Sequence, residues 1–132
     1  MKKILIDTNA YSRFLAGDEN VLAALIEAQI AYMSVFVMGE LFAGFKGGNR
    51  EGENKILLER FLQKPTIRIL NASAETAEIF GMIKNNLKKA GTPLPVNDIW
   101  IASHAVETGS TVITYDAHFK KIPGLRLWSR IN

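Results

Sequence analysis

The chain has 132 residues, of which 48% are hydrophobic and 22% are charged, and its formal net charge at pH 7 is +3. These values predict one globular domain over residues 1–132 that can bury a full core. The absence of cysteine excludes disulfides and thiolate metal sites and favours a reducing, cytoplasmic location. No apolar run reaches the roughly 20 residues of a membrane span, and the basic balance favours an acidic partner such as nucleic acid.

Strands and helices alternate along the predicted chain. The first apolar run, residues 4–6, is continuous, which is typical of a strand buried on both faces, and it is too short for a signal-peptide core. We predict strands over 4–6, 30–35, 66–70, 111–114 and 125–128. We predict helices over 10–18, 19–29, 35–45, 53–64, 74–91 and 97–109, a polar turn over 46–54 and a helical turn over 117–122.

This order predicts an α/β fold with a mostly parallel sheet of four to five strands and helices on both faces. Ser73, with Asn71, offers an N-cap to the helix over 74–91, and Asn97 offers one to the helix over 97–109. In such sheets ligands bind beyond the carboxyl ends of the strands. Asp7 directly follows the first strand and Asp116 follows the fourth, so we expect both side chains at that edge.

Four acidic residues stand among apolar or small neighbours. Asp7 ends the first strand, and Asp116 follows the fourth. Glu40 is the one acid of an apolar helix, where we expect core rather than water around it. Asp98 lies in the first turn of a helix, where the helix dipole favours its ionised form. Each has a structural alternative: Asp7 as a strand end and helix cap, Asp98 as a first-turn acid, and Asp116 as the start of a turn.

Together the four acids suggest a metal site. Clustered carboxylates repel one another and raise one another's pKa, and a divalent cation relieves this repulsion. Ligands that are all oxygen, without cysteine, select hard ions such as Mg²⁺ or Mn²⁺. Such an ion among acids in a basic protein favours phosphodiester hydrolysis. For His104 and His118 we expect packing or surface roles.

Four segments carry a resemblance to a known family: "IDTNAY", "VMGELFAGF", "PVNDIWIASHA" and "TYDAHFKKIPGL". In their order and context the chain resembles, over nearly its whole length, the PIN-domain ribonucleases, and among them the VapC toxins of type II toxin–antitoxin pairs. The resemblance implies a single PIN domain, a three-layer α/β/α sandwich, and a Mg²⁺- or Mn²⁺-dependent endoribonuclease acting on RNA.

Carried over position by position, the family's catalytic and metal-binding acids fall on Asp7, Glu40, Asp98 and Asp116. Use of the fourth acid varies in the family, which leaves open whether Asp116 contacts the metal directly or through a water. The resemblance gives supporting polar roles to Thr8, Asn9, Ser34 and Thr114.

Apolar residues crowd the two helices that carry the site. They are either ordinary core or a groove for a partner helix: Tyr11, Phe14, Leu15, Phe42 and Phe45. The resemblance favours the groove, because VapC toxins pair with an antitoxin and form homodimers, for which residues 80–91 are a candidate segment. Arg13, Lys46 and Arg50 are candidates for phosphate contact.

Three alternatives remain. A structure-specific DNA nuclease would use the same acids, although the short chain lacks the insertions that usually hold a branched duplex. A non-catalytic PIN module that only binds RNA or a partner would not need all four acids. A phosphotransfer domain of the HAD or receiver type is disfavoured, because no second aspartate stands two residues after Asp7.

Overall fold

The computed structural model describes residues 2–128, and its centre is a four-stranded parallel sheet. The strands are β1 (Lys3–Ile6), β2 (Ile30–Ser34), β3 (Ile67–Leu70) and β4 (Thr111–Ile113). Their order across the sheet is β3-β2-β1-β4, and every pair is parallel. From β1 the chain adds β2 and then β3 on one side, and it then crosses to add β4 on the other side of β1. The direction of strand addition therefore reverses between β1 and β4. The predicted α/β fold with a parallel sheet is confirmed.

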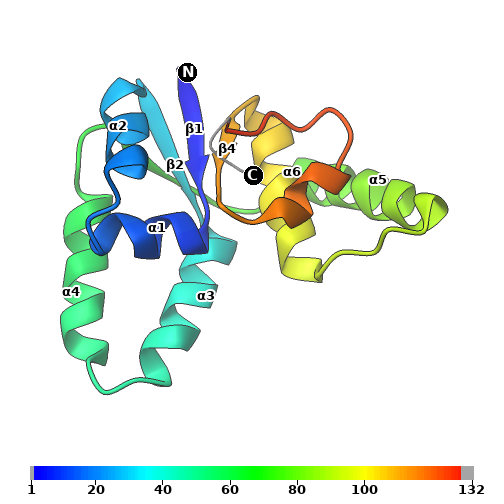
Figure 1. The fold of residues 1–132 in the computed structure, drawn as a ribbon. Coiled ribbons are helices and arrows are strands. Elements are labelled where there is room, and N and C mark those ends of the chain that lie inside the picture. Colours follow the sequence, from blue (N-terminus) through cyan, green and yellow to red (C-terminus); the bar gives the residue numbers. More distant parts are fainter. Residues whose placement is uncertain (1, 129–132) are drawn as a thin grey trace.

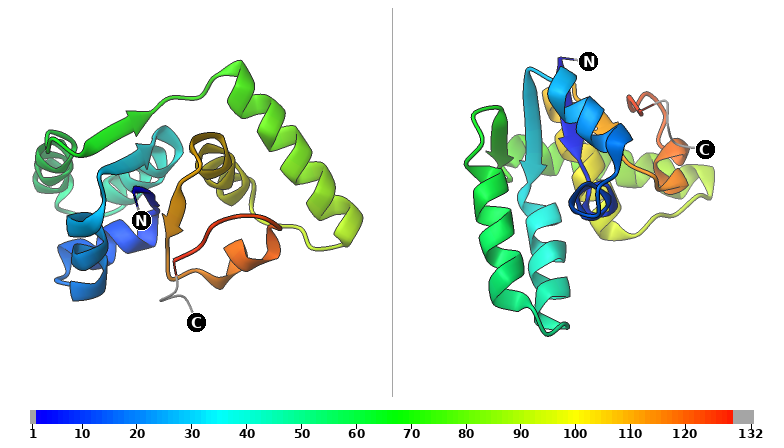
Figure 2. Two further views of the ribbon diagram at one scale, coloured as in Figure 1. Left: turned by 90° about the horizontal axis from the view of Figure 1, so that it is seen from above. Right: turned by 60° about the vertical axis from the view of Figure 1, so that its left-hand side comes forward.

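Helices cover both faces of this sheet. They are α1 (Thr8–Leu15), α2 (Glu19–Glu27), α3 (Val35–Lys46), α4 (Glu51–Leu62), α5 (Ala74–Ala90), α6 (Val96–Thr108) and the 3₁₀ helix η1 (Ala117–Lys121). Figure 2 shows α1, α2 and η1 on one side of the strands and α5 and α6 on the other. The antiparallel pair α3 and α4 extends beyond the carboxyl ends of the strands (Figure 1). Within residues 2–128, no helix combines the length and the apolar character needed to cross a membrane.

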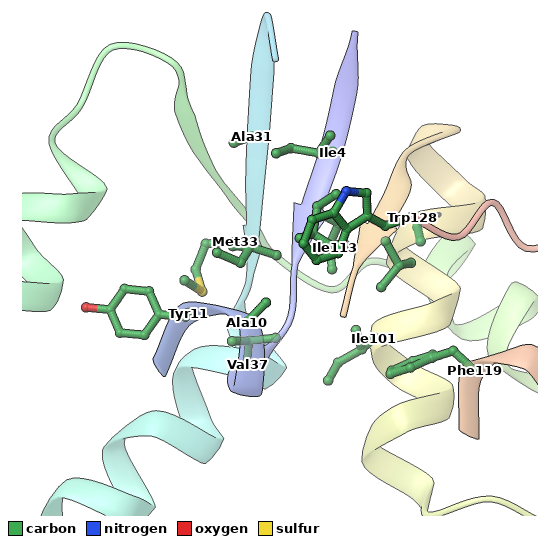
Figure 3. Packing of buried hydrophobic residues seen from close by; sticks show 14 of the residues in the cluster. Ile4, Ala10, Tyr11, Ala31, Met33, Val37, Ile101, Ile113, Phe119 and Trp128 are labelled. Atoms are coloured by element: carbon green, nitrogen blue, oxygen red, sulfur yellow. The ribbon is translucent and has the colours of Figure 1, made fainter. Parts of the chain in front are cut away.

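The core explains why three apolar residues of β1 lead directly into Asp7. Ile4, Leu5 and Ile6 are fully buried, as expected for a strand between two helical layers. Figure 3 shows core side chains of the strands together with Ala10 from α1 and Val37 from α3. This packing fixes the first turns of α1 and α3 against the carboxyl edge of the sheet.

Short polar side chains start several helices. Ser73 caps α5 through the backbone N–H of Thr76, which confirms the predicted cap. The predicted cap at Asn97 is wrong. Helix α6 begins one residue earlier, after Pro95, whose carbonyl accepts the N–H of Asp98 at 3.1 Å. Asn97 lies inside the helix, and its side-chain amide donates to the Phe36 carbonyl at 3.4 Å.

Two segments differ from the predicted elements. Residues 125–128 form one parallel bridge, between Leu127 and Val112, rather than a fifth strand. Strand β4 has only three residues, so it offers little edge for a longer ladder. Helix α4 begins at Glu51, inside the predicted turn, with Glu51 and Glu53 in its first turn, where the helix dipole favours acids.

Candidate active site

A cleft of about 470 Å³ lies at the carboxyl edge of the sheet, where the strand order reverses between β1 and β4. Its lining comes from α1, α3, α6 and the segment after β4. The lining residues are Asp7, Thr8, Asn9, Ser12, Arg13, Glu40, Asp98, Ile101 and Asp116. The structure thus brings together all four acids that the sequence singled out, from four separate parts of the chain.

Asp7 is the most enclosed of these acids, with 4% of its surface exposed. One carboxylate oxygen accepts the backbone N–H of Ala10 at 2.9 Å, which caps α1, and the other accepts the hydroxyl of Thr114. Burial raises the pKa of Asp7 to about 7, and the carboxylates of Asp116 and Asp98 add to the shift, while the two hydrogen bonds oppose it. Asp7 is therefore both a structural cap and a wall of the cleft.

Asp98 and Asp116 form the more open side of the cleft. Asp98 projects from the first turn of α6, and its side chain is 16% exposed. Its pKa is raised, first by burial and then by the charges of Asp116 and Glu40. Burial and the neighbouring acids thus act against the helix dipole, which favours the ionised form of Asp98. The N–H of Asp116 donates to the Thr114 hydroxyl at 2.9 Å, so Thr114 links Asp116 to Asp7.

Glu40 differs from its predicted environment. It is exposed on α3, not surrounded by core, because its side chain faces the open cleft. Its carboxylate accepts the hydroxyl of Thr8, the first residue of α1. Thr8 therefore restrains Glu40 in the way expected for a supporting residue beside a carboxylate.

The other supporting residues act on the frame of the site. Asn9 accepts the backbone N–H of Tyr115 at 3.2 Å and so ties α1 to the segment that carries Asp116. The hydroxyl of Ser34 accepts the N–H of Phe36 at 3.0 Å, which caps α3, and contacts Nδ1 of His104 at 2.8 Å. In the part of the chain that the structure describes, both side chains bond to groups other than the four carboxylates, so both position the elements that carry the acids.

The two histidines occupy different environments. His104 is fully buried between Ser34 and the carbonyl of Asn71, and burial lowers its pKa, so its predicted packing role is confirmed. His118 has instead one ring nitrogen 3.3 Å from Asp116 and 3.7 Å from Asp98. Its predicted surface position is confirmed, but its approach to two of the acids was not predicted. The signal was its place two residues after an acid at a strand end.

Arg13 is the one basic side chain among the described residues that line the cleft. Its guanidinium lies 4.5 Å from the centroid of the Tyr115 ring, a cation–π contact. The Tyr115 hydroxyl in turn donates to Asp18 at 2.9 Å, which fixes the ring. Lys46 and Arg50, the other predicted phosphate contacts, form ion pairs with Glu51 and Glu53 on α4.

The predicted partner groove is only partly exposed. Tyr11 is 1% exposed and packs edge-on against Phe61, so its assignment to an open groove is wrong and it belongs to the core. Phe14 lines a separate pocket of about 200 Å³ between α1, α2 and α4. Leu15 is 43% and Phe42 is 36% exposed, and Phe45 lies half-buried beside Phe42. A partner could therefore cover Leu15 and Phe42, but not Tyr11.

The donor set of the cleft fits a divalent cation. Four carboxylates converge there, and the pKa values of Asp7 and Asp98 are raised partly by their acidic neighbours. The one arginine of the lining stacks on Tyr115 rather than pairing with these acids in the described contacts. Oxygen ligands of this kind suit hard divalent ions.

Comparisons with known proteins identify the family of the chain. The chain belongs to the PIN domain family, whose sequence model matches residues 4–125. It is similar to Ribonuclease VapC2 of Rickettsia felis, with 29% identity over 93% of this chain and 94% of the relative. It is also similar to the tRNA(fMet)-specific endonuclease VapC of Salmonella typhimurium, with 25% identity over 96% of this chain and 97% of the relative. A crystal structure of DNA-bound VapBC from Salmonella typhimurium superposes with a TM-score of 0.86 and 26% identity, covering 97% and 98% of the two chains.

Proposed function

We propose that this chain is a metal-dependent endoribonuclease and the toxin of a type II toxin–antitoxin pair. The observation that carries the proposal is the convergence of four carboxylates on one cleft at the reversal point of the sheet. The similarity to relatives named ribonuclease and endonuclease supports RNA as the substrate class. A bacterial cytoplasm, where RNA and a partner antitoxin are both present, is the proposed place of action.

Asp7, Glu40, Asp98 and Asp116 are the residues that would hold Mg²⁺ or Mn²⁺. When bound, such an ion supplies Lewis-acid chemistry, which stabilises charge on the phosphate and makes water a stronger nucleophile at neutral pH. The chain contributes a fixed frame for this chemistry. Both oxygens of Asp7 are held by hydrogen bonds, and Thr8 restrains Glu40, so two of the ligands are oriented before substrate binds.

Arg13 is the proposed phosphate contact. It lies in the same cleft as the acids, and the Tyr115 ring supports its guanidinium. A guanidinium in this place would bind a phosphate oxygen of RNA and offset the repulsion between the substrate and the four acids. Lys46 and Arg50 are less suited, because each is paired with a glutamate outside the cleft.

The experiment that tests the enzymatic function is cleavage of a substrate panel by the purified chain. The panel contains structured and single-stranded RNA, tRNA(fMet), single-stranded DNA and a DNA flap, each with Mg²⁺, Mn²⁺, Ca²⁺ or EDTA. We expect cleavage of RNA alone, support by Mg²⁺ or Mn²⁺, little turnover with Ca²⁺, and none with EDTA. Cleavage of the flap in preference to RNA, or full activity in EDTA, would contradict the proposal.

The proposed partners are an antitoxin and a second copy of this chain. Leu15 and Phe42 expose apolar surface on α1 and α3, the two helices that also contribute Arg13 and Glu40 to the cleft, so a partner segment bound along these helices would restrict access to the acids. Phe42→Asp should weaken the complex with the antitoxin about tenfold and leave RNA cleavage by the free chain intact. Ile56→Asp, on an exposed apolar residue of α4, is the control, and equal binding by the two variants would contradict this surface assignment.

A further inference from the structure

One ring nitrogen stands among the oxygens of the cleft. Nδ1 of His118 lies 3.3 Å from Oδ1 of Asp116 and 3.7 Å from Oδ2 of Asp98. Ligand atoms of these three residues all lie within 4.8 Å of one another, close enough to share one ion. His118 thus lies beside the open side of the cleft, opposite the enclosed Asp7.

The local backbone holds His118 in this position. Asp116 caps η1 by accepting the backbone N–H of His118 at 2.9 Å. The next residue, Phe119, is 1% exposed and anchors the turn in the core, while the His118 side chain is 52% exposed. The ring faces the two acids directly, because its Nδ1 is the atom that lies near both Asp116 and Asp98.

We propose that His118 is a ligand of the same cation as Asp98 and Asp116, and that it shifts the preference of the cleft from Mg²⁺ toward Mn²⁺. This inference rests on the proposed function, because it concerns the ion of that site. Mg²⁺ binds oxygen ligands almost exclusively and keeps several waters, whereas transition ions accept imidazole nitrogen more readily. A single imidazole beside two carboxylates therefore changes selectivity without changing the charge of the ligand set.

The alternative role for His118 is that of a counter-ion. An imidazolium would reduce repulsion between Asp98 and Asp116 in the metal-free protein and would then have to leave when the cation binds. The two roles predict opposite effects of removing the ring. Loss of a ligand weakens Mn²⁺ binding, whereas loss of a competing cation strengthens it or leaves it unchanged.

The test is Mn²⁺ binding by the full chain without RNA, measured by calorimetry and by pulsed electron paramagnetic resonance. In the wild type we expect a ¹⁴N coupling from a coordinated imidazole. His118→Gln should remove that coupling and weaken Mn²⁺ binding about tenfold, while Mg²⁺ binding changes less than twofold. Lys120→Gln, which removes an exposed charge from the same turn, is the control and should keep both the coupling and the affinity.

The outcomes separate this inference from the proposed function. Mn²⁺ bound without ¹⁴N coupling, or bound by His118→Gln as tightly as by the wild type, would overturn the role of His118 and leave the four-carboxylate site standing. No Mn²⁺ or Mg²⁺ binding by the wild type would overturn both. The coupling is measured on the wild type itself, so the result does not depend on how well the variant folds.

Discussion

The two walls of the cleft are built in different ways. On the β1 side, Asp7 is buried, and both its oxygens are occupied by Ala10 and Thr114, so the residue also holds α1 in place. On the opposite side, Asp98 and Asp116 are partly exposed, and a half-exposed histidine stands beside them. One wall is part of the core, and the other lies close to solvent.

Because of this difference, substitutions on the two walls should affect cation binding and folding stability to different extents. A substitution on the open wall should change the cleft's affinity for cations and leave the fold almost unaffected, because few structural hydrogen bonds depend on it. A substitution at Asp7 should change both, because the same carboxylate caps a helix and faces the acids. The predictions below test this contrast, in order of decreasing expected effect on RNA cleavage.

The largest effect is expected on the open wall. Asp98→Asn should lower RNA cleavage by about a hundredfold or more at every Mg²⁺ concentration, because it removes a charged ligand while keeping the shape of the side chain. Its melting temperature without metal should equal or exceed that of the wild type, since a charge leaves a repulsive cluster.

Asp116→Ala should lower RNA cleavage less than Asp98→Asn and should regain part of its activity in excess Mn²⁺. Equal losses that Mn²⁺ cannot rescue would show that the two acids contribute equally to the site.

At Asp7 the contrast is tested by pH. Asp7→Asn should also abolish most cleavage, yet keep the oxygen that caps α1. The pKa of Asp7 in the folded chain is about 7, above its value in an unfolded chain. The folded state therefore holds this proton more tightly, and the associated stability, complete below pH 4, is lost as pH rises through 7, by at most roughly 1.4 kcal/mol per pH unit.

The measurement is thermal unfolding in EDTA between pH 5 and 8. Asp7→Asn cannot ionise, so its melting temperature relative to the wild type should rise over this range. Asp98→Asn, on the open wall, is the matched control and should show a smaller rise. If the two variants followed the same pH dependence, the distinction between a buried and an open wall would be wrong.

Much of this site could be predicted from the sequence, because two of its acids directly follow predicted parallel strands. A parallel sheet places the ends of β1 and β4 at one edge, so Asp7 and Asp116 had to lie near each other. The sequence correctly predicted that Glu40 joins the other acids, but it wrongly predicted that core surrounds its side chain. Its helix α3 is apolar along its length yet extends beyond the sheet, and the sequence does not tell where a helix leaves the core.

The remaining errors concern packing between distant residues. The sequence pattern groups Tyr11 with Phe14 as a groove residue, but in the structure Phe61, fifty residues later in the chain, covers the Tyr11 ring. His118 reads as part of a basic turn, yet the anchoring of Phe119 directs the turn toward Asp98. The predicted fifth strand has the right composition but meets a β4 of only three residues. Each of these outcomes depends on a partner that local patterns do not specify.

A smaller effect on cleavage is expected at Arg13. Arg13→Gln should raise the KM for RNA about tenfold and change kcat less, because the residue is proposed to bind a phosphate rather than the ion. Arg13→Lys should recover part of the affinity. Arg50→Gln, an arginine already paired with Glu53, is the control and should change KM less than twofold. A loss confined to kcat would place Arg13 in the chemical step instead.

The smallest effect on cleavage is expected at Ser34, which lies behind the cleft rather than in its lining. Ser34→Ala removes both the cap of α3 and the partner of His104 Nδ1 at a fully buried position, so it should lower the free energy of unfolding by about 2 kcal/mol. Ser73→Ala removes the cap of α5 at an exposed position and should cost only about 1 kcal/mol. Well below the melting temperature, both variants should cleave RNA at rates within threefold of the wild type. A hundredfold loss in Ser34→Ala, with α3 still folded by hydrogen exchange, would place Ser34 among the residues that act directly on the acids.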